Sequence, residues 1–203
     1  MVVCPYCGAV LSRTPKRRTA CLLCGKPILV RNGRLFTDEE GRAVDWCSRL
    51  RIDESEFQRT RDRLSAQFGR VASCGDTMWR LMHTVLDAAP SWHGRKMIYF
   101  QMARFLWEEK RDCLEVRRQS VRMQLADWKA SSDLGLLDLA RVRLRVITAG
   151  TASCPECRRL DAHLFTYEEA ESAMPLPVAT CAHEKSGGQP RGWCRCTYGL
   201  VFL

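Results

Sequence analysis

The sequence predicts a mainly helical protein that carries small β-structured zinc modules at its two ends. Cysteines cluster near both ends of the 203-residue chain. Apolar residues recur at helical spacing through the middle, and the pattern changes to strict alternation near residue 140. We therefore expect a zinc ribbon at 1–37, a helical domain at 38–139 and, at 140–203, a C-terminal cysteine-rich zinc module that opens with a strand.

Composition places the chain among ordinary globular proteins, with 46% apolar and 27% charged residues. No apolar run in the sequence approaches the ~18 residues that indicate a membrane span. The first residues lead directly into a cysteine motif and show no signal-peptide pattern. We expect a cytoplasmic protein without a membrane partner. In a reducing compartment, twelve cysteines indicate metal binding rather than disulfides.

The N-terminal module is predicted from two C-x-x-C-G turns that lie thirteen residues apart. Their four sulfurs suit one closed, tetrahedral, structural zinc ion. A module this small cannot fold on an apolar core alone, so the metal would supply much of its stability. Redox-active dithiols are the alternative interpretation. The predicted ligands are Cys4, Cys7, Cys21 and Cys24.

A β-hairpin is expected directly after the second cysteine pair. Asn32-Gly33 stands between two apolar runs, and Asn-Gly in that setting is typical of a two-residue hairpin turn. The strands are predicted near residues 27–31 and 34–37.

Positive charge is concentrated in the same module. The chain has a formal charge of +9, and residues 1–37 hold seven Lys or Arg and no Asp or Glu. Cations on a loop between two metal-binding turns could contact phosphates of DNA or RNA. The alternative is a solvated loop that keeps a small module soluble. The candidate contacts are Arg13, Lys16, Arg17, Arg18, Arg31 and Arg34.

The middle of the chain shows repeated helix-start patterns, each followed by an apolar stripe. Glu56 and Glu115 lie three residues after an aspartate, which predicts reciprocal capping boxes at those two starts. Three isolated cysteines in this region are interpreted as small buried apolar residues. The expected helix starts are Asp53, Ser73, Ser91 and Asp112, and the isolated cysteines are Cys47, Cys74 and Cys113.

The C-terminal module opens with an alternating segment at 140–147. Valine and leucine occupy one face and arginine the other, which predicts a half-buried strand. A further capping box, Thr166 with Glu169, predicts a short helix that ends before Pro175. The outward arginines are Arg141, Arg143 and Arg145.

A second zinc site is predicted around Cys154 and Cys157, which form a C-x-x-C pair. Two further ligands are required. If residues 193–198 form a strand, Cys194 and Cys196 point to the same face and can approach one ion. These two are favoured as the missing ligands. The main rival is Cys181, followed by His183. A redox-active C-x-x-C is the alternative.

No catalytic residue is assigned from the sequence. It contains no phosphate-binding glycine loop, no nucleophile elbow and no H-E-x-x-H motif. Asp161 and His163 follow the C-x-x-C closely and could act as acid and base beside an open zinc site. A zinc-dependent hydrolase-like enzyme is therefore kept as an alternative, although enzymatic activity is not the favoured interpretation.

Three long stretches resemble an uncharacterised family of bacterial and phage-associated zinc-ribbon proteins. They lie at 4–31, 97–112 and 147–198. The last fifty residues are also similar to the end of phage head-morphogenesis (minor head) proteins. Those proteins have a C-x-x-C, an "LDG" turn, which here reads "LDA" at Leu160–Ala162, and a terminal "CRC". The resemblance implies a shared fold plan and a phage-associated origin.

The favoured function is a non-enzymatic zinc-binding protein that contacts nucleic acid through the basic ribbon. The first alternative is a protein–protein interaction or assembly subunit of a phage-derived or defence complex. Two bound zinc ions are expected in either case, one in each cysteine-rich module.

Overall fold

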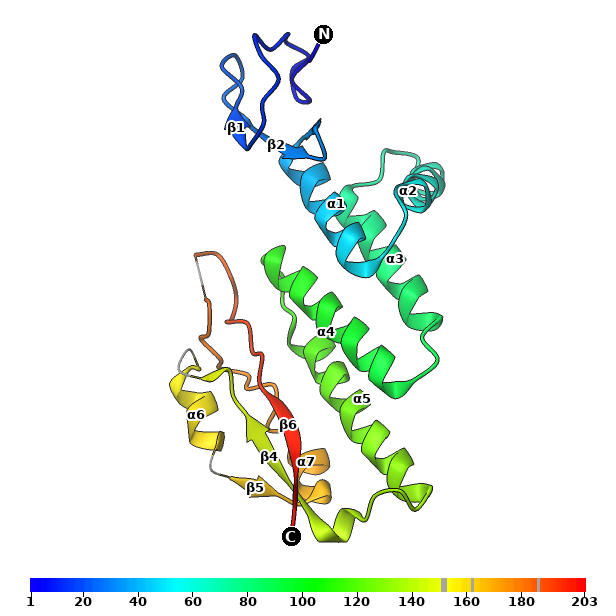
Figure 1. The fold of residues 1–203 in the computed structure, drawn as a ribbon, viewed down its shortest axis with the longest axis vertical. Coiled ribbons are helices and arrows are strands. Elements are labelled where there is room, and N and C mark those ends of the chain that lie inside the picture. The colour runs from blue at the N-terminus through cyan, green and yellow to red at the C-terminus, as the bar shows by residue number, and fades with distance from the viewer. Residues whose placement is uncertain (151–152, 162, 186) are drawn as a thin grey trace. The chain divides into compact units, whose positions relative to one another are not determined.

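The computed structural model describes residues 1–150, 153–161, 163–185 and 187–203. These residues divide into two compact units, Met1–Thr84 and Val85–Leu203. Figure 1 traces the elements of each. The structure has the mainly helical, zinc-module fold class that the sequence predicts. The three-part domain division stays a prediction. The "LDA" stretch is described only in part, because its alanine lies outside these ranges.

The first unit begins with a small antiparallel sheet in the order β1-β2-β3. Its hairpin follows the prediction: Arg31 lies opposite Arg34 across a turn in which Asn32 and Gly33 both have positive φ. Gly33 has a φ of 75°, which glycine adopts at no steric cost. The strands are β1 (Thr19–Ala20), β2 (Pro27–Arg31) and β3 (Arg34–Phe36).

Three helices follow: α1 (Asp38–Leu50), α2 (Glu54–Phe68) and α3 (Cys74–Asp87). Asp53 caps α2 by accepting a hydrogen bond from Ser55 N at 2.7 Å. The predicted start of α2 is therefore confirmed, but the predicted capping box is wrong, because Asp53 accepts from Ser55 N and not from the amide of Glu56. Ser73 Oγ likewise accepts from the amide of the third residue of α3 at 3.0 Å.

An apolar core lies between α1 and α3. Trp46, Cys47, Met78, Leu81 and Met82 are all buried. The Cys47 Sγ lies 3.6 Å from the Met78 Sδ. The predicted interpretation of Cys47 as a small buried residue is confirmed, and burial raises the pKa of its thiol to about 11.

The second unit contains two long helices, α4 (Trp92–Glu108) and α5 (Leu114–Asp133), which pack side by side (Figure 1). Asp112 lies one residue before Cys113, the N-cap of α5, and its carboxylate accepts from Leu114 N at 2.9 Å, so the helix starts within one residue of the prediction. The predicted capping box is wrong at this helix. Glu115 pairs with Arg122 instead, at 2.5 Å, and the cap residue makes no side-chain bond.

The second unit also holds an antiparallel sheet in the order β5-β4-β6. The alternation predicted at 140–147 is confirmed, since Val142, Leu144 and Val146 are buried while Arg145 is exposed. A 3₁₀ turn, η1 (Leu139–Arg141), leads into the sheet. Its strands are β4 (Val142–Ile147), β5 (Leu164–Phe165) and β6 (Thr197–Phe202).

Two short helices complete the second unit. α7 (Tyr167–Ala173) has the predicted capping box of Thr166 and Glu169. α6 (Pro155–Asp161) begins directly after the first cysteine of the C-terminal pair and was not predicted. Among the described residues, no helix combines the length and apolar character needed to cross a membrane.

The strand predicted at 193–198 is wrong for its first four residues. β6 starts at Thr197, so Cys194 and Cys196 lie in an irregular segment before it. The positions of their sulfurs are therefore set by the geometry of this loop, which sequence periodicity does not predict.

Gly41 in α1 tests the contact between this helix and β2. A Cβ at Gly41 would lie 2.5 Å from Leu29 Cδ1 and 2.9 Å from Leu29 Cβ. We expect Gly41→Ala to lower the free energy of unfolding by about 1–3 kcal/mol, because overpacking outweighs the better helix propensity of alanine. The control is Gly75→Ala in α3, whose nearest neighbour would be 3.7 Å away. Urea unfolding measures both, and equal effects would contradict the packing argument.

Candidate metal centres

The N-terminal centre has the geometry of one tetrahedral site. The sulfurs of Cys4, Cys7, Cys21 and Cys24 all lie within 4.8 Å of one another. Cys4 Sγ is 3.9 Å from Cys24 Sγ, and Cys7 Sγ is 3.9 Å from Cys21 Sγ. A tetrahedral ion with metal–sulfur bonds of about 2.3 Å holds its sulfurs about 3.8 Å apart. These four residues could therefore hold a metal ion together.

Two equivalent turns place these sulfurs. Gly8 N donates to Cys4 O at 3.0 Å, and Gly25 N donates to Cys21 O at 2.8 Å. Both glycines have positive φ, of 70° and 69°. Backbone N–H groups of Cys24 and Leu23 lower the pKa of Cys21 to about 6. This shift favours the thiolate of Cys21, and the thiolate is the form that binds metal.

The apolar core of this module is very small. Besides Cys4 and Cys21, its cluster of buried residues contains only Ile28 in the described part of the chain, with Tyr6 and Leu35 partly buried against it. So little burial cannot offset the entropy cost of ordering the loops. The fold of the module therefore depends on the four sulfurs and what they bind.

The C-terminal centre brings five buried cysteines together. Their sulfurs form two groups of three that share Cys157: one with Cys154 and Cys181, the other with Cys194 and Cys196. Within each group every sulfur lies within 4.8 Å of the other two, and Cys154 Sγ is 3.8 Å from Cys181 Sγ. α6 supplies Cys157 from its first turn. Each group could hold a metal ion.

The four favoured cysteines all belong to these sulfur groups, and Cys181, the main rival, belongs to one of them as well. His183 belongs to neither sulfur group, although its side chain is buried. Its Nε2 lies 3.2 Å from a carboxylate oxygen of Glu184. The geometry therefore makes the centre an all-sulfur one among the described residues.

The closeness of the thiols couples their protonation. Contacts with the thiols of Cys157, Cys181 and Cys196 hold the pKa of Cys194 well below its usual value. Contacts with the thiols of Cys181, Cys194 and Cys196 raise the pKa of Cys157, because its proton is held between neighbouring sulfurs. A metal ion would replace these shared protons and deprotonate the ligands.

A buried arginine supports the end of the cluster. Arg117 on α5 donates from Nε to Cys194 O at 3.1 Å and from Nη2 to Cys196 O at 2.6 Å. Its guanidinium also lies over the Phe100 ring, 5.0 Å from the centroid. Across the described residues, no carboxylate lies within ion-pair distance of it. Burial lowers the pKa of Arg117, and the thiolates of the two cysteines oppose that shift.

Sequence reasoning missed Arg117. It is one of many helical arginines and carries no pattern that marks it as buried. The available indication is its position on the α5 face that also carries the buried Val121 and Gln124. Gln124 makes a parallel contact, donating from Nε2 to Tyr198 O at 2.9 Å.

The suggested acid–base pair lies apart from the sulfurs. Neither Asp161 nor His163 belongs to a metal-binding group within the described ranges. The Asp161 carboxylate lies 3.9 Å from the Arg145 guanidinium. The exposed His163 ring packs against Phe165 at 4.2 Å. These side chains have structural neighbours that account for their positions.

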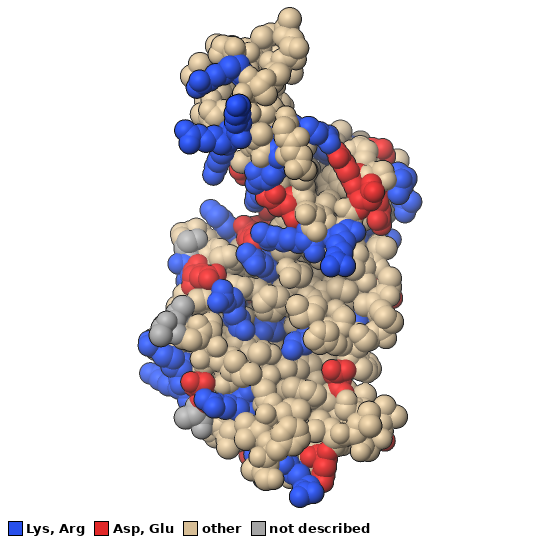
Figure 2. All heavy atoms as spheres, in the orientation of Figure 1, with Lys and Arg blue, Asp and Glu red and all other residues tan. Residues whose placement is uncertain are grey.

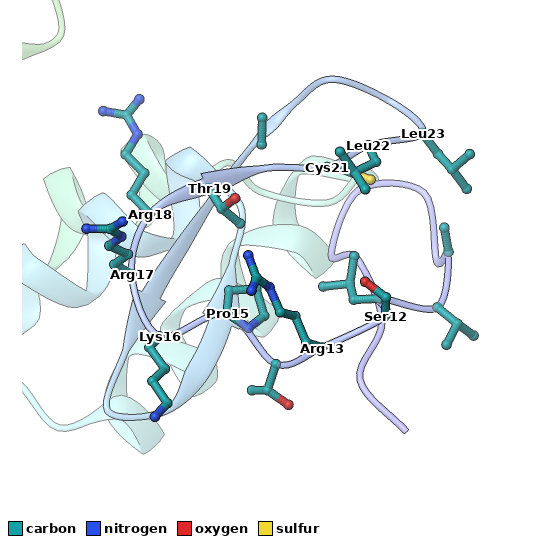
Figure 3. Close-up of a pocket in the computed structure, with 15 residues that line it drawn as sticks. Ser12, Arg13, Pro15, Lys16, Arg17, Arg18, Thr19, Cys21, Leu22 and Leu23 are labelled. Atoms are coloured by element: carbon teal, nitrogen blue, oxygen red, sulfur yellow. The ribbon is translucent and has the colours of Figure 1, made fainter.

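The basic residues of the N-terminal module divide into two sets. Arg31 makes two 2.7 Å bonds to Asp45, and Arg34 lies 2.7 Å from a Glu54 oxygen. The other four line an open hollow along the loop between the cysteine pairs (Figure 3). Figure 2 shows Lys and Arg side chains gathered on one side of this module. These four are Arg13, Lys16, Arg17 and Arg18.

Comparison with known proteins gives no relative from which a function could be transferred. No family model matches the chain, and neither the curated proteins nor the solved structures give a match.

Removing one ligand tests the dependence of the N-terminal module on metal. We expect Cys21→Ser to lower the bound metal by one ion per chain and to expose the amides of residues 1–31 to hydrogen exchange. Cys47→Ser, which alters a buried cysteine outside the sulfur groups, should keep the full metal content. Native mass spectrometry and hydrogen-exchange mass spectrometry measure these effects. A full metal complement in Cys21→Ser would contradict the assignment.

Proposed function

We propose that the chain is a non-enzymatic, zinc-stabilised protein that contacts nucleic acid through the basic loop of its N-terminal ribbon. The observation that carries the proposal is the loop itself. It presents Arg13, Lys16, Arg17 and Arg18 along one hollow, in a module without acidic residues. A cytoplasmic location and a phage association, both expected from the sequence, belong to the same proposal.

Zinc is the metal that best fits the N-terminal centre. Four thiolates in a closed tetrahedral group are typical of structural zinc sites. A zinc ion with four thiolates carries a net charge of about −2. The seven Lys and Arg of residues 1–37 exceed that charge. The module therefore stays cationic when zinc is bound.

The loop is suited to phosphate contact because its ends are fixed. The cysteine pairs hold both ends, so little entropy is lost when its side chains meet a ligand. Arg18 lies 3.8 Å from Asp38, whereas Arg13, Lys16 and Arg17 have no carboxylate within ion-pair distance among the described residues. Arg31 and Arg34 already pair with carboxylates, so their contribution to binding should be smaller.

Salt dependence tests this function. If the four loop cations contact phosphates, the slope of log affinity against log salt is about −2.8 to −3.6, so affinity falls roughly 50- to 150-fold between 50 and 200 mM salt. Arg17→Ala with Arg18→Ala should reduce the slope by about 1.4–1.8 and weaken binding roughly tenfold. Fluorescence anisotropy with labelled DNA and RNA oligonucleotides measures both quantities.

The matched control for this test is Arg59→Ala with Arg63→Ala, which removes two exposed arginines from α2. We expect the control to leave affinity and slope nearly unchanged. Equal losses in the two double variants would indicate that only net charge matters. Absence of binding at 50 mM salt would overturn the proposed function.

A protein partner is the second candidate, because the same hollow also has an apolar part. Leu22 is 95% exposed and Leu23 is 79% exposed, and both line the hollow with Val10. Figure 3 shows the two leucines at the opposite end of the loop from Arg17 and Arg18. Exposed apolar side chains next to charged ones are typical of protein interaction surfaces. An assembly subunit would use this part of the surface.

Substitution of Leu22 and Leu23 distinguishes a protein-interaction function from a nucleic-acid-binding function. An interaction subunit predicts that Leu22→Ser with Leu23→Ser weakens a copurified protein complex at least about tenfold and leaves oligonucleotide affinity unchanged. The reverse pattern, in which only Arg17→Ala with Arg18→Ala has an effect and only on oligonucleotides, would exclude an assembly role for this surface. Size-exclusion chromatography and anisotropy on the same preparations give the answer.

A further inference from the structure

The C-terminal centre holds more sulfur than one tetrahedral ion uses. Four ligands complete such an ion, as at the N-terminal centre, where all four sulfurs lie within 4.8 Å of one another. The C-terminal centre has five sulfurs, and within the described residues its groups at this distance contain three each. Those two groups have Cys157 in common. The thiols of Cys181 and Cys194 also interact, so the two groups lie side by side, with Cys157 as the one sulfur that belongs to both.

We propose that the C-terminal centre binds two thiophilic divalent metal ions, bridged by the thiolate of Cys157. Cys154 and Cys181 complete the sulfur ligands of one ion, and Cys194 and Cys196 those of the other. Zinc is the probe of choice, because thiolate ligands select it. The inference rests on the metal-binding part of the proposed function and is independent of nucleic-acid binding.

Cys157 is placed to act as the bridge. It is 1% exposed and belongs to both groups. A thiolate sulfur has several lone pairs and can donate to two metal ions at once. Three protein ligands leave one tetrahedral position on each ion for a small ligand such as water. Cys154 and Cys196, in contrast, each belong to one group.

Charge balance favours two ions over one. Two divalent ions with five thiolates carry a single net negative charge, and the buried Arg117 guanidinium beside Cys194 and Cys196 supplies a single positive one. One ion with four thiolates would leave an excess negative charge in the same buried volume. Uncompensated buried charge is costly. A neutral unit of two ions, five thiolates and Arg117 avoids this cost.

The two sulfur groups are held together by backbone contacts as well as by sulfur. Gly192 N donates to Cys181 O at 2.7 Å, and Trp193 N donates to His183 O at 2.7 Å. Only glycine fits at 192, because a Cβ there would lie 2.5 Å from His183 N. These bonds fix the segment of Cys181 beside the segment of Cys194. The second group is therefore positioned before a metal binds.

Metal stoichiometry of the full chain tests the proposal. Native mass spectrometry of the zinc-loaded protein should show three zinc ions: one at the N-terminal centre and two at the C-terminal one. Cys196→Ser should retain two ions and Cys157→Ser only one, because Cys157 serves both C-terminal ions. Two ions in the wild-type chain would overturn the proposal and leave the zinc-binding function intact. A chain that binds no zinc would overturn both.

A second measurement detects the bridge itself and does not depend on the stability of Cys157→Ser. In Cys21→Ser, which disables the N-terminal centre, Co²⁺ is titrated into the C-terminal one. A thiolate shared by two Co²⁺ ions couples their spins, so the electron paramagnetic resonance signal per ion should fall as the second ion binds. A signal that rises in proportion to bound Co²⁺ up to two ions, or saturates at one, would overturn the bridge.

Discussion

The sulfur clusters are the constraint on which the rest of this structure depends. In each unit, cysteines from separate segments meet. The N-terminal cluster contains Ile28 as its one fully apolar buried residue in the described part. The C-terminal cysteines belong to a larger core that also contains Val121, Leu144 and Tyr198. Thiols and thiolates at such distances repel or share protons unless a cation replaces the protons. A metal ion held by the N-terminal sulfurs would repay the entropy of ordering the loops of that module. Helix caps and strand pairing then adjust the segments whose approximate positions the sulfurs determine.

In the second unit, Arg117 transmits this constraint from the sulfur cluster to the helices. It reaches from α5 to the carbonyl oxygens of Cys194 and Cys196, and Gln124 two turns further on reaches Tyr198. A buried cation is stable only beside compensating negative charge. The thiolates supply that charge, so α5, the sulfurs and the start of β6 depend on one another. Helix and metal centre are thus parts of a single energetic unit rather than two modules joined by a linker.

Much of this fold could be predicted from the sequence where the determinants are local. The Asn32-Gly33 hairpin, the alternating residues of β4 and the Thr166 capping box follow from short patterns, and each is present. Prediction failed where contacts with residues further along the chain determine the structure. Glu115 leaves its expected cap for Arg122, a residue two turns away, and Cys194 and Cys196 meet Cys157 without forming a strand. Cys181 is held beside the other cysteines by a hydrogen bond from Gly192 N to its carbonyl oxygen, a contact that spacing along the chain does not reveal.

The order of elements along the chain also has a consequence during synthesis. β6 pairs with β4, yet it follows every other element of its unit, and about forty residues separate Cys154 from Cys196. At 5–20 residues per second, a ribosome needs roughly 2–8 s to make that interval. For most of that time Cys154 and Cys157 exist without Cys194 and Cys196, and β4 lacks its pairing with β6. The nascent chain therefore passes through a stage in which exposed thiols and an open strand edge are vulnerable to oxidation and misassociation.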